Sequence, residues 1–364
     1  MAAPRRIDLR RTEAHAALQE AALVLRRGGL VVLPTETVYG VAAREDRPDA
    51  VARLTALKDG RGKPWSHAVA DLSTLDSRLA PLPQSAQRLI ERWWPGPITL
   101  VLPRRDGGRL GVRVPGHAFT RELAAEAGVA LLLPSANLPG APPARSAQEL
   151  QPQLLELVDL IVDDGPCPLG EASTVVAPAP ACLLLLREGV VSRADLLRHA
   201  RPLVLVVCTG NTCRSPMAAA LLEQALARAA QAQPQLLLPA VRSAGLGAGP
   251  KSPATPAAVD ALAERGLDLS GHASAPVVPE ALLAADLVLG LTHGHVHALR
   301  ELLAAHSEGA GRAPPVELFD PGGQAVEDPF GAPLGVYRKV AAMLERMAAA
   351  RAAAIVEPTG SVTG

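Results

Sequence analysis

The sequence is poor in aromatic residues, which make up 2% of its 364 residues, whereas 48% are hydrophobic. Its cores must therefore be built from Leu, Val and Ala, and this hydrophobic fraction excludes a disordered chain. The scarcity of aromatics also leaves few rings on which RNA bases could stack, namely Tyr39, Trp65, Trp93 and Trp94. We expect Trp93 and Trp94 to pack at a helix end instead.

Cysteine is equally scarce. The four cysteines, at positions 167, 182, 208 and 213, suggest neither a zinc knuckle nor the disulfide framework of a secreted domain. The first residues, MAAPRRIDLRRTEAH, lack the apolar core of a signal peptide. The longest apolar runs, such as Ala181 to Leu186, are too short to cross a bilayer. We therefore expect a soluble cytoplasmic protein that makes no membrane contact.

There is also no excess of charge of either sign, because 36 Lys and Arg balance 36 Asp and Glu. Dedicated nucleic-acid-binding proteins carry a basic excess, so binding of tRNA or double-stranded RNA would depend on a local patch.

The length favours two domains. Short apolar strands alternate with amphipathic helices, which is the α/β pattern. In the first half, helices are expected at Glu13–Arg27, Pro48–Leu57 and Gln84–Trp94, and the many strands predict an open, twisted mixed sheet. The predicted strands are Leu30–Leu33, Ile98–Leu102, Gly111–Val114, Val129–Leu133, Leu160–Val162, Ser173–Val176 and Cys182–Leu186.

Arg201-Pro202 interrupts the pattern after a last helix at Ser192–Ala200, and marks the predicted boundary. We predict a first domain at 1–197, a linker at 198–202, a second domain at 203–352 and a disordered tail at 353–364. The second domain has the pattern of a small doubly wound parallel sheet. Its predicted strands are Leu203–Val207, Ala240–Ser243, Leu287–Leu291 and Val316–Leu318, and its helices are Pro216–Ala229, Pro256–Arg265, His295–Ala305 and Val336–Ala354.

The sequence CTGNTCRS, from Cys208 to Ser215, lies between a predicted strand and a predicted helix. A thiol is a nucleophile only as thiolate, and a helix N-terminus stabilises the thiolate. Ser215 and Pro216 are the residue types that suit the N-cap and the first helical position. The arrangement therefore suits a nucleophilic Cys208 at the start of a helix.

The residues between this cysteine and the helix suit an anion-binding loop. Gly210 and Asn211 tolerate left-handed dihedral angles, so the backbone N–H groups of such a loop can point inward. Arg214 can bind two phosphate oxygens at once. The alternative is a buried structural cysteine in an ordinary turn, but the combination of residue types favours a phosphate cradle.

VCTGNTCRSPMA resembles the low-molecular-weight protein tyrosine phosphatase family, as do RSAG at 242–245, ADLVLGLTHGH at 285–295 and DPFG at 328–331. The resemblance implies that Cys208 is the nucleophile, that Arg214 binds phosphate, that Ser215 stabilises the thiolate and that Asn211 holds the loop. It also implies a general acid in a late Asp-Pro. Of Asp320 and Asp328 we choose Asp328, because a short loop and a final helix follow it.

Two further residues of the loop, Thr212 and Cys213, bear on substrate choice and on redox chemistry. Thr212 replaces the larger apolar residue of tyrosine-directed members and resembles the protein-arginine phosphatases, although it could merely pack. The family often forms a reversible disulfide at this spacing, so the resemblance implies one between Cys213 and Cys208, with a packed free thiol as the alternative. An arsenate reductase would need later cysteines, and none follows Cys213. His293, His295 and His297 could bind a metal, but a solvated helix start is the preferred interpretation.

The first half places basic and hydroxyl residues near strand ends, which suits a polyanion such as a nucleoside triphosphate. The segments LVVLPTETVYGVAA, LKDGRGKP, WWPGPITLVLP, VRVPGH, LLLPSANLPG and DDGPCPLGEASTVV resemble the YrdC-like threonylcarbamoyl-adenylate synthase family. That resemblance implies ATP contacts from Lys58, Arg61, Ser135, Asn137 and Arg187. It implies threonine contacts from Thr35, His67, Arg113 and Ser173. The family's Lys-x-Arg-Pro is stretched here to Lys58-Asp59-Gly60-Arg61-Gly62.

Together these resemblances imply a bifunctional enzyme. The first domain would use L-threonine, bicarbonate and ATP with Mg²⁺ to make threonylcarbamoyl-AMP for tRNA modification, with tRNA threonylcarbamoyl-transferase proteins as partners. The second would hydrolyse a phosphorylated protein without a cofactor. The alternative is a regulatory fusion whose first domain only binds nucleotide or RNA.

Overall fold

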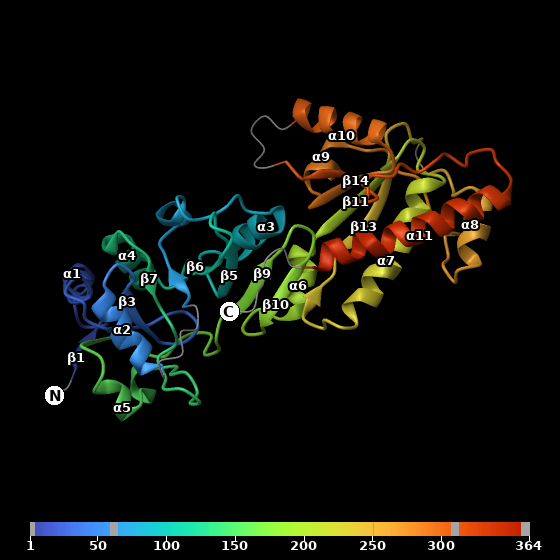
Figure 1. Cartoon of the computed structure of the whole chain (residues 1–364). Coiled ribbons are helices and arrows are strands. Elements are labelled where there is room, and N and C mark those ends of the chain that lie inside the picture. The colour runs from blue at the N-terminus through green and yellow to red at the C-terminus, as the bar shows by residue number, and fades with distance from the viewer. Residues whose placement is uncertain (1–3, 59–64, 250, 307–312, 358–364) are drawn as a thin grey trace.

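The structure is a computed structural model that describes residues 4–58, 65–249, 251–306 and 313–357. Its described strands form a large mixed sheet and a small parallel sheet (Figure 1). The spatial order in the large sheet is β1 (Arg5–Asp8), β8 (Leu160–Asp163), β2 (Val31–Leu33), β3 (Gly40–Arg44), β7 (Leu131–Leu132), β4 (His67–Ala68), β6 (Arg109–Arg113), β5 (Ile98–Pro103), β9 (Thr174–Pro178), β10 (Leu183–Arg187) and β12 (Leu236–Leu237). The predicted α/β class is confirmed.

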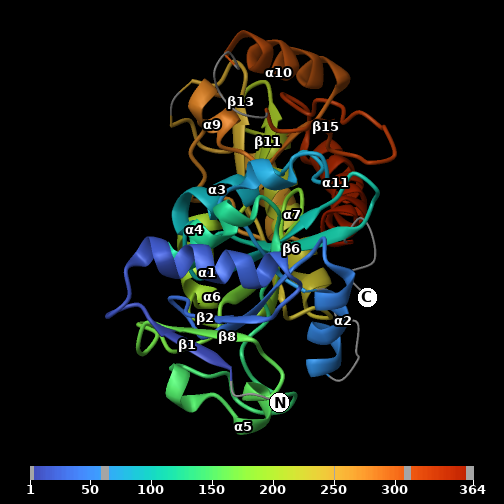
Figure 2. The same ribbon diagram turned by 90° about the vertical axis from the view of Figure 1, so that its left-hand side faces the viewer.

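The half of the large sheet that runs from β1 to β7 in this order is covered on both faces. Helices α1 (Ala14–Arg26) and α4 (Ala118–Ala127) pack on one face, and α1 lies across the strands in Figure 2. Helices α2 (Pro48–Leu57) and α5 (Pro152–Leu155) pack on the opposite face, together with the short turn η2 (Ala147–Glu149). Another short turn, η1 (Leu72–Leu75), contributes Leu75 to the core of the other half of the sheet. The Glu13 carboxylate caps α1 by accepting hydrogen bonds from two backbone N–H groups of its first turn.

The other half of the large sheet is covered by helices on one face. Helices α3 (Gln84–Trp93) and α6 (Arg193–Ala200) pack with alternate residues of β5, β6, β9 and β10. Because successive side chains of a strand point to opposite faces, the remaining residues of these strands point the other way. That second face forms the floor of a pocket described below. Trp93 and Trp94 pack at the end of α3, as predicted, where the Trp94 indole donates to the Ile98 carbonyl.

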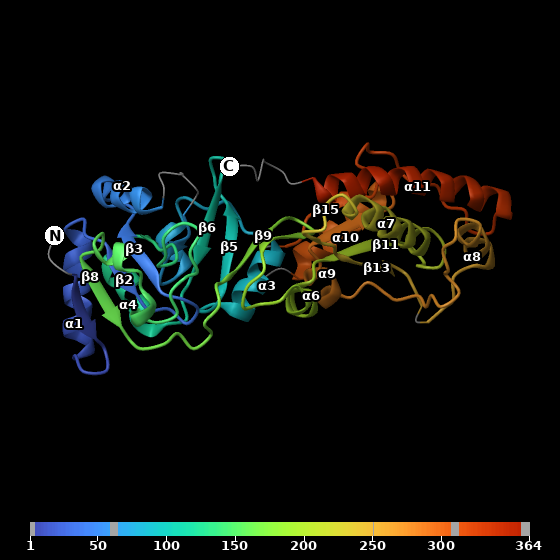
Figure 3. The same cartoon turned by 90° about the horizontal axis from the view of Figure 1, so that it is seen from below.

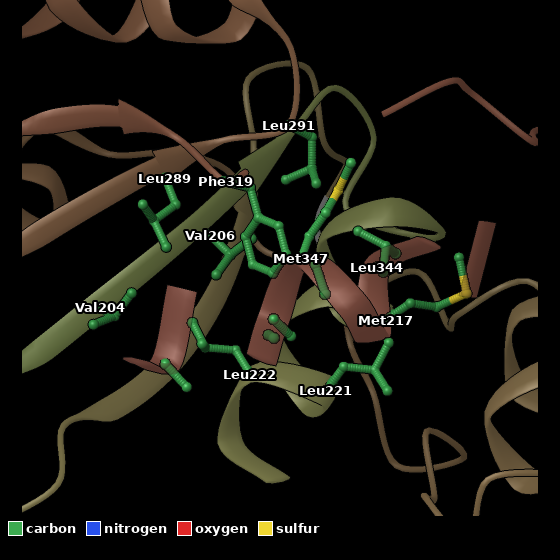
Figure 4. Packing of buried hydrophobic residues seen from close by; sticks show 14 of the residues in the cluster. Val204, Val206, Met217, Leu221, Leu222, Leu289, Leu291, Phe319, Leu344 and Met347 are labelled. Carbon is green, nitrogen blue, oxygen red and sulfur yellow. The ribbon is translucent and has the colours of Figure 1, made fainter. Parts of the chain in front are cut away.

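The small sheet has the order β13 (Ala240–Gly245), β11 (Leu203–Cys208), β14 (Leu287–Gly290) and β15 (Val316–Leu318). Helices α7 (Arg214–Ala230), α8 (Pro256–Ala263) and α11 (Leu334–Val356) contribute to the core on one face, and α9 (Pro279–Leu283) and α10 (His293–His306) to the core on the other. Figure 4 shows Leu and Met side chains of α7 and α11 meeting Val204, Val206 and Leu289 of the strands. This is a doubly wound arrangement.

The two halves of the chain pack against each other at a junction, where α3 and α6 lie between the two sheets (Figure 3). Strand β12, from beyond the predicted boundary, pairs antiparallel with β10 of the large sheet. The Arg88 guanidinium forms an ion pair with the fully buried carboxylate of Asp286, which also accepts a hydrogen bond from the Leu203 N–H at 2.7 Å. Ala179, Ala181 and Cys182 belong to the core that contains the end of α11.

Two details of the predicted domain limits need correction. Residues 198–200 are the last turn of α6 rather than linker, and Ala200 is buried. The predicted tail starts too early, because α11 continues to Val356 and both Ile355 and Val356 are buried. Residues 358–364 lie outside the described part of the chain. Within that part, no helix has the length and apolar character needed to cross a membrane.

Candidate active sites

The loop after β11 has the shape expected of an anion cradle. Asn211 has a φ of 53°, so the left-handed conformation predicted for this residue type is observed. The loop lies directly against the end of β13, where Leu246 and Gly247 donate to the carbonyls of Cys208 and Thr209. A Cβ atom at Gly245 would lie 2.5 Å from the Thr209 carbonyl oxygen. Glycine is therefore required there for the close approach of the two segments.

The thiol of Cys208 lies at the base of this loop and is buried. Its Sγ lies 3.0 Å from the Ser215 hydroxyl and accepts from the Asn211 N–H at 3.3 Å. Ser215 is not the N-cap that the sequence suggested, because α7 already begins at Arg214. The Ser215 hydroxyl instead lies inside the loop and contacts the thiol, the Asn211 amide and the Ala244 carbonyl.

Asn211 connects the loop to neighbouring segments through its side chain. Its amide nitrogen donates to Ser215 and to Ser243, both at 2.9 Å, and its amide oxygen accepts from the Ala275 N–H at 2.8 Å. The His272 ring lies 2.7 Å from its backbone carbonyl. Asn211 is thus placed as expected of a residue that holds the loop, and His272 is a contributor that the sequence analysis missed.

Arg214 and Asp328 face each other at the loop. The Arg214 guanidinium, which is almost fully buried, forms an ion pair with the half-exposed Asp328 carboxylate and donates to the Val326 carbonyl at 3.3 Å. Asp320, the rejected candidate for the acid, accepts from the Gln324 N–H at 2.8 Å and acts as a turn residue. The fold therefore brings Asp328, more than a hundred residues away in sequence, to Arg214.

Thr212 and Cys213 occupy different environments within the same loop. Thr212 is partly exposed, and its hydroxyl lies 3.7 Å from the Cys213 sulfur. Cys213 is buried, with its Sγ 3.4 Å from the Tyr337 hydroxyl and 3.5 Å from the Thr255 hydroxyl. All four cysteines are free thiols.

The histidines of the HGHVH segment do not share one environment. His297 is exposed and pairs with Glu301 on the surface of α10. His295 is buried, contrary to the predicted solvated helix start, and its Nε2 lies 3.0 Å from the Thr209 hydroxyl. Among the described residues, no group of three or more His, Cys, Asp or Glu side chains is arranged to hold a metal. A buried histidine at the loop was invisible to sequence reasoning.

The second candidate site is a pocket of about 820 Å³ over the uncovered face of the large sheet. Its floor comes from alternate residues of β6 and β5, namely Arg109, Gly111 and Arg113 together with Thr99 and Val101. The intervening residues of those strands belong to the core with α3 and α6. The pocket brings together seven residues predicted to bind ATP or threonine, which are Thr35, Lys58, Arg113, Ser135, Asn137, Ser173 and Arg187.

Lys58 lies at the C-terminal end of α2, where its ammonium group turns into the pocket. Its Nζ donates to the carbonyls of Ser135 and Asn137 at 2.8 and 2.5 Å, and to the Asn137 side chain at 3.0 Å. Burial lowers the pKa of Lys58 to about 8. Lys58 is therefore still mostly charged at pH 7 and loses its charge as the pH rises through about 8.

Arg113 and Arg187 reach the pocket by different routes. Arg113 follows the regular alternation of β6, and its Nη2 donates to Glu36 at 2.7 Å and to the Thr37 hydroxyl at 2.9 Å. Arg187 depends on a register shift between β9 and β10, which lets both Leu186 and Arg187 face the pocket. Its guanidinium donates to the Ser173 carbonyl at 2.7 Å.

Two predicted contacts are not seen in this pocket. His67 lies between Ser66 and Ala68, which both line it, so its ring points to the opposite side of β4 and contacts the Gly111 carbonyl and Glu45. The predicted threonine contact from His67 is therefore not supported. Arg61 lies outside the described residues. Arg109, which lines the pocket, was not predicted.

Comparison with known proteins assigns both parts of the chain to families. Residues 23–189 match the Sua5/YciO/YrdC family model, described as telomere recombination, and residues 203–358 match low molecular weight phosphotyrosine protein phosphatase. The threonylcarbamoyl-AMP synthase of Bacillus subtilis is 33% identical over 193 residues, which cover 49% of this chain and 55% of that protein. The chain thus spans about half the length of this relative.

Other relatives match more of their own length. A putative threonylcarbamoyl-AMP synthase of Mycobacterium leprae is 35% identical over 49% of this chain and 86% of its own length. The solved structure of the YwlE arginine phosphatase from Geobacillus stearothermophilus is 34% identical, covers 42% of this chain and 90% of that chain, and has a TM-score of 0.35. Residues 203–358 thus match the low molecular weight phosphatase model, and the chain belongs, through its N-terminal half, to the threonylcarbamoyl-AMP synthase family.

Proposed function

We propose that the C-terminal domain hydrolyses phosphorylated proteins through a covalent intermediate on Cys208. The observation that carries the proposal is the buried thiol, which receives hydrogen bonds from the Asn211 N–H and contacts the Ser215 hydroxyl within reach of the Arg214–Asp328 pair. Hydrogen bonds of this kind stabilise a thiolate. No cofactor is needed, because the nucleophile, the anion-binding loop and the acid all belong to this chain.

The proposed reaction has two steps. The Cys208 thiolate attacks phosphorus, the bond from phosphorus to the leaving group breaks, and Asp328 gives its proton to that group. Asp328 then accepts a proton from water, which attacks the thiophosphate, releases inorganic phosphate and regenerates the thiolate. Arg214, released from Asp328, binds two phosphoryl oxygens through both steps.

The proposed substrate class is phosphoarginine in proteins, supported by Thr212 and by the DPFG sequence that begins at Asp328. A threonine leaves more room and polarity beside the loop than a large apolar residue, and its hydroxyl can contact a guanidinium or orient water. Thr212→Ile should shift the preference from phosphoarginine toward phosphotyrosine peptides. Hydrolysis of p-nitrophenyl phosphate serves as the control for an intact loop, and an unchanged preference would contradict this substrate assignment.

For the N-terminal domain we propose synthesis of L-threonylcarbamoyl-AMP, supported by a pocket lined by Lys58, Arg113, Arg187 and hydroxyl side chains. Threonine and bicarbonate condense to a carbamate with loss of water. A carbamate oxygen attacks the α-phosphorus of ATP, and pyrophosphate leaves. Catalysis then consists of positioning and charge neutralisation by these cations. The product would feed threonylcarbamoyladenosine formation in tRNA by tRNA threonylcarbamoyl-transferase proteins, in the cytoplasm.

Mg²⁺ fits this pocket as an ion carried by ATP rather than one held by the protein. The described residues that line the pocket offer hydroxyl, carbonyl and amide oxygens but no carboxylate. Mg²⁺ commonly binds through substrate phosphates and water in such sites. When bound with ATP, it would neutralise part of the triphosphate charge.

One set of variants tests both activities. Pyrophosphate release from ATP, dependent on threonine and bicarbonate, should be lost in Lys58→Ala and retained in Cys208→Ser. Phosphatase activity should show the reverse pattern. Lys339→Ala, which removes an exposed lysine of α11, is the matched control for Lys58→Ala and should retain both activities. Absence of pyrophosphate release from the unaltered protein would favour the regulatory fusion, in which the first domain only binds nucleotide or RNA.

A further inference from the structure

The loop from Cys208 to Ser215, here called the phosphate loop, makes different numbers of hydrogen bonds on its two sides. Toward β13, Asn211 makes side-chain hydrogen bonds to Ser243 and to the Ala275 N–H, and the backbone of Gly245 lies against the loop. Toward α10, the described residues show one side-chain hydrogen bond to the loop, between His295 Nε2 and the Thr209 hydroxyl at 3.0 Å. Thr209 is the residue directly after the nucleophile and is exposed at the mouth of the loop.

The first turn of α10 places His295 rigidly. The His295 N–H donates to the Thr292 hydroxyl at 3.2 Å, so this turn is capped. A Cβ atom at Gly290 would lie 2.9 Å from the backbone nitrogen of Val296, which shows how closely the turn approaches β14. His295 itself is 7% exposed. Its ring therefore has little freedom to leave the loop.

The hydrogen-bonding pattern determines which ring nitrogen carries the proton. Nδ1 of His295 is buried and has no partner among the described residues. A buried N–H without an acceptor is costly, so the proton is better placed on Nε2, which then donates to the Thr209 oxygen. Burial and the nearby Arg214 lower the pKa of His295, against an opposing effect of Asp328, and so favour the neutral ring.

We propose that His295 is a positioning residue that orients Thr209, so that the Thr209 hydroxyl donates its hydrogen to a phosphoryl oxygen of the substrate. The oxygen of Thr209 accepts from His295, which leaves its own hydrogen free for an anion in the loop. This adds a side-chain donor to the backbone N–H groups and Arg214. The inference rests on the proposed phosphatase function and concerns phosphate recognition, whichever phosphorylated side chain is the substrate.

Inorganic phosphate is a suitable probe, because it needs no knowledge of the natural substrate. The measurement is the rate at which iodoacetate alkylates Cys208, read by mass spectrometry of its peptide, as phosphate is added to the full-length protein. His295→Ala should weaken protection by phosphate about five- to tenfold, the range expected for a lost hydrogen bond. Thr209→Val should weaken it by the same factor, and the double variant should be no worse than either.

Matched controls separate positioning from folding. His297→Ala removes a histidine of the same helix that is exposed and should leave protection unchanged. His295→Gln retains a side-chain N–H donor and should recover part of the affinity, as should Thr209→Ser relative to Thr209→Val. Because Thr209 is exposed, its substitution tests the proposal even if a variant of the buried His295 does not fold.

The outcomes distinguish this proposal from the function on which it rests. Unchanged phosphate protection in Thr209→Val, or independent effects of the two substitutions, would overturn the role of His295. Cys208 of the unaltered protein that is neither alkylated nor protected by phosphate would overturn the phosphatase function as well. A KM for p-nitrophenyl phosphate that rises more than kcat falls in both single variants would support the proposal.

Discussion

The loop at 208–215 and the pocket over the large sheet differ in how their residues are distributed. Most of the loop comes from eight consecutive residues, and local bonds such as that between Cys208 and the Asn211 N–H hold it together. The pocket takes Lys58 from a helix end, Arg113 from β6 and Arg187 from β10. The residues of the loop are neighbours in sequence, so they can be recognised from one short segment. The residues of the pocket come together only when the large sheet has folded.

The two sites also lie in different places relative to the junction. Strand β11 begins at the junction, where Leu203 bonds to Asp286, and runs toward Cys208. Five residue steps of about 3.3 Å place Cys208 about 17 Å along the strand from that contact. The loop is thus carried away from the large sheet.

The largest effect is expected from Asp328→Ala, which removes the distant member of the otherwise local site. General acid catalysis contributes about 10²–10⁴-fold, so turnover of substrates with poor leaving groups should fall by at least about 100-fold. Substrates whose leaving group needs no proton should lose far less. Asp320→Ala is the control, since Asp320 only supports a turn. Equal losses for good and poor leaving groups would count against the acid role.

Arg88→Ala tests whether the two regions unfold together in one transition. Removing one partner of a buried ion pair costs about 3–5 kcal/mol, and here the fully buried Asp286 carboxylate would lose its cation. In thermal inactivation, the variant should then lose synthase and phosphatase activities together, at a lower temperature than the unaltered protein does. The control is Arg92→Ala, an exposed position on the same helix. Loss of one activity at an unchanged temperature for the other would show that the domains unfold separately.

Gly245→Ala should damage the loop alone. The added methyl group would lie 2.5 Å from the Thr209 carbonyl oxygen, and overpacking of this kind costs about 1–3 kcal/mol. Phosphatase kcat/KM should fall roughly tenfold or more, whereas pyrophosphate release should be unaffected. At Gly247 the nearest atom to a new Cβ lies 3.9 Å away, so Gly247→Ala is the matched control. Equal effects at the two glycines would argue against close packing as the cause.

The pH dependence of ATP binding concerns the pocket alone. The lowered pKa of Lys58, about 8, means that its ammonium is present below this pH and is lost as the pH rises through it. Between pH 7 and pH 9 the charged fraction in the free protein falls about tenfold, so ATP affinity measured by calorimetry should fall by up to that factor. Lys58→Arg, which stays charged, should bind with little change over the same range. A pH-independent affinity in the unaltered protein would remove Lys58 from the triphosphate site.

Much of the molecule follows from local pattern. The alternation of strands and helices predicts both sheets, because periods of 2 and 3.6 residues reflect which side chains must be buried. The strand at Gly40–Arg44 was missed, since its residues are almost uniformly buried and show no alternation. Helix α4 at Ala118–Ala127 was missed too, although Gly128, with a φ of 66°, ends it as a glycine commonly does.

The sequence by itself predicted Cys208 as the nucleophile, Arg214 as the phosphate ligand and Asn211 as the residue that holds the loop, because strand, turn and helix start are local events. Only the tertiary structure decided that Arg187 reaches the pocket through a register shift, that His67 points away from it and that His295 reaches Thr209. Each of these depends on which face of an element meets a neighbour distant in sequence, and that choice is made by packing of the whole sheet rather than by any residue's own neighbours.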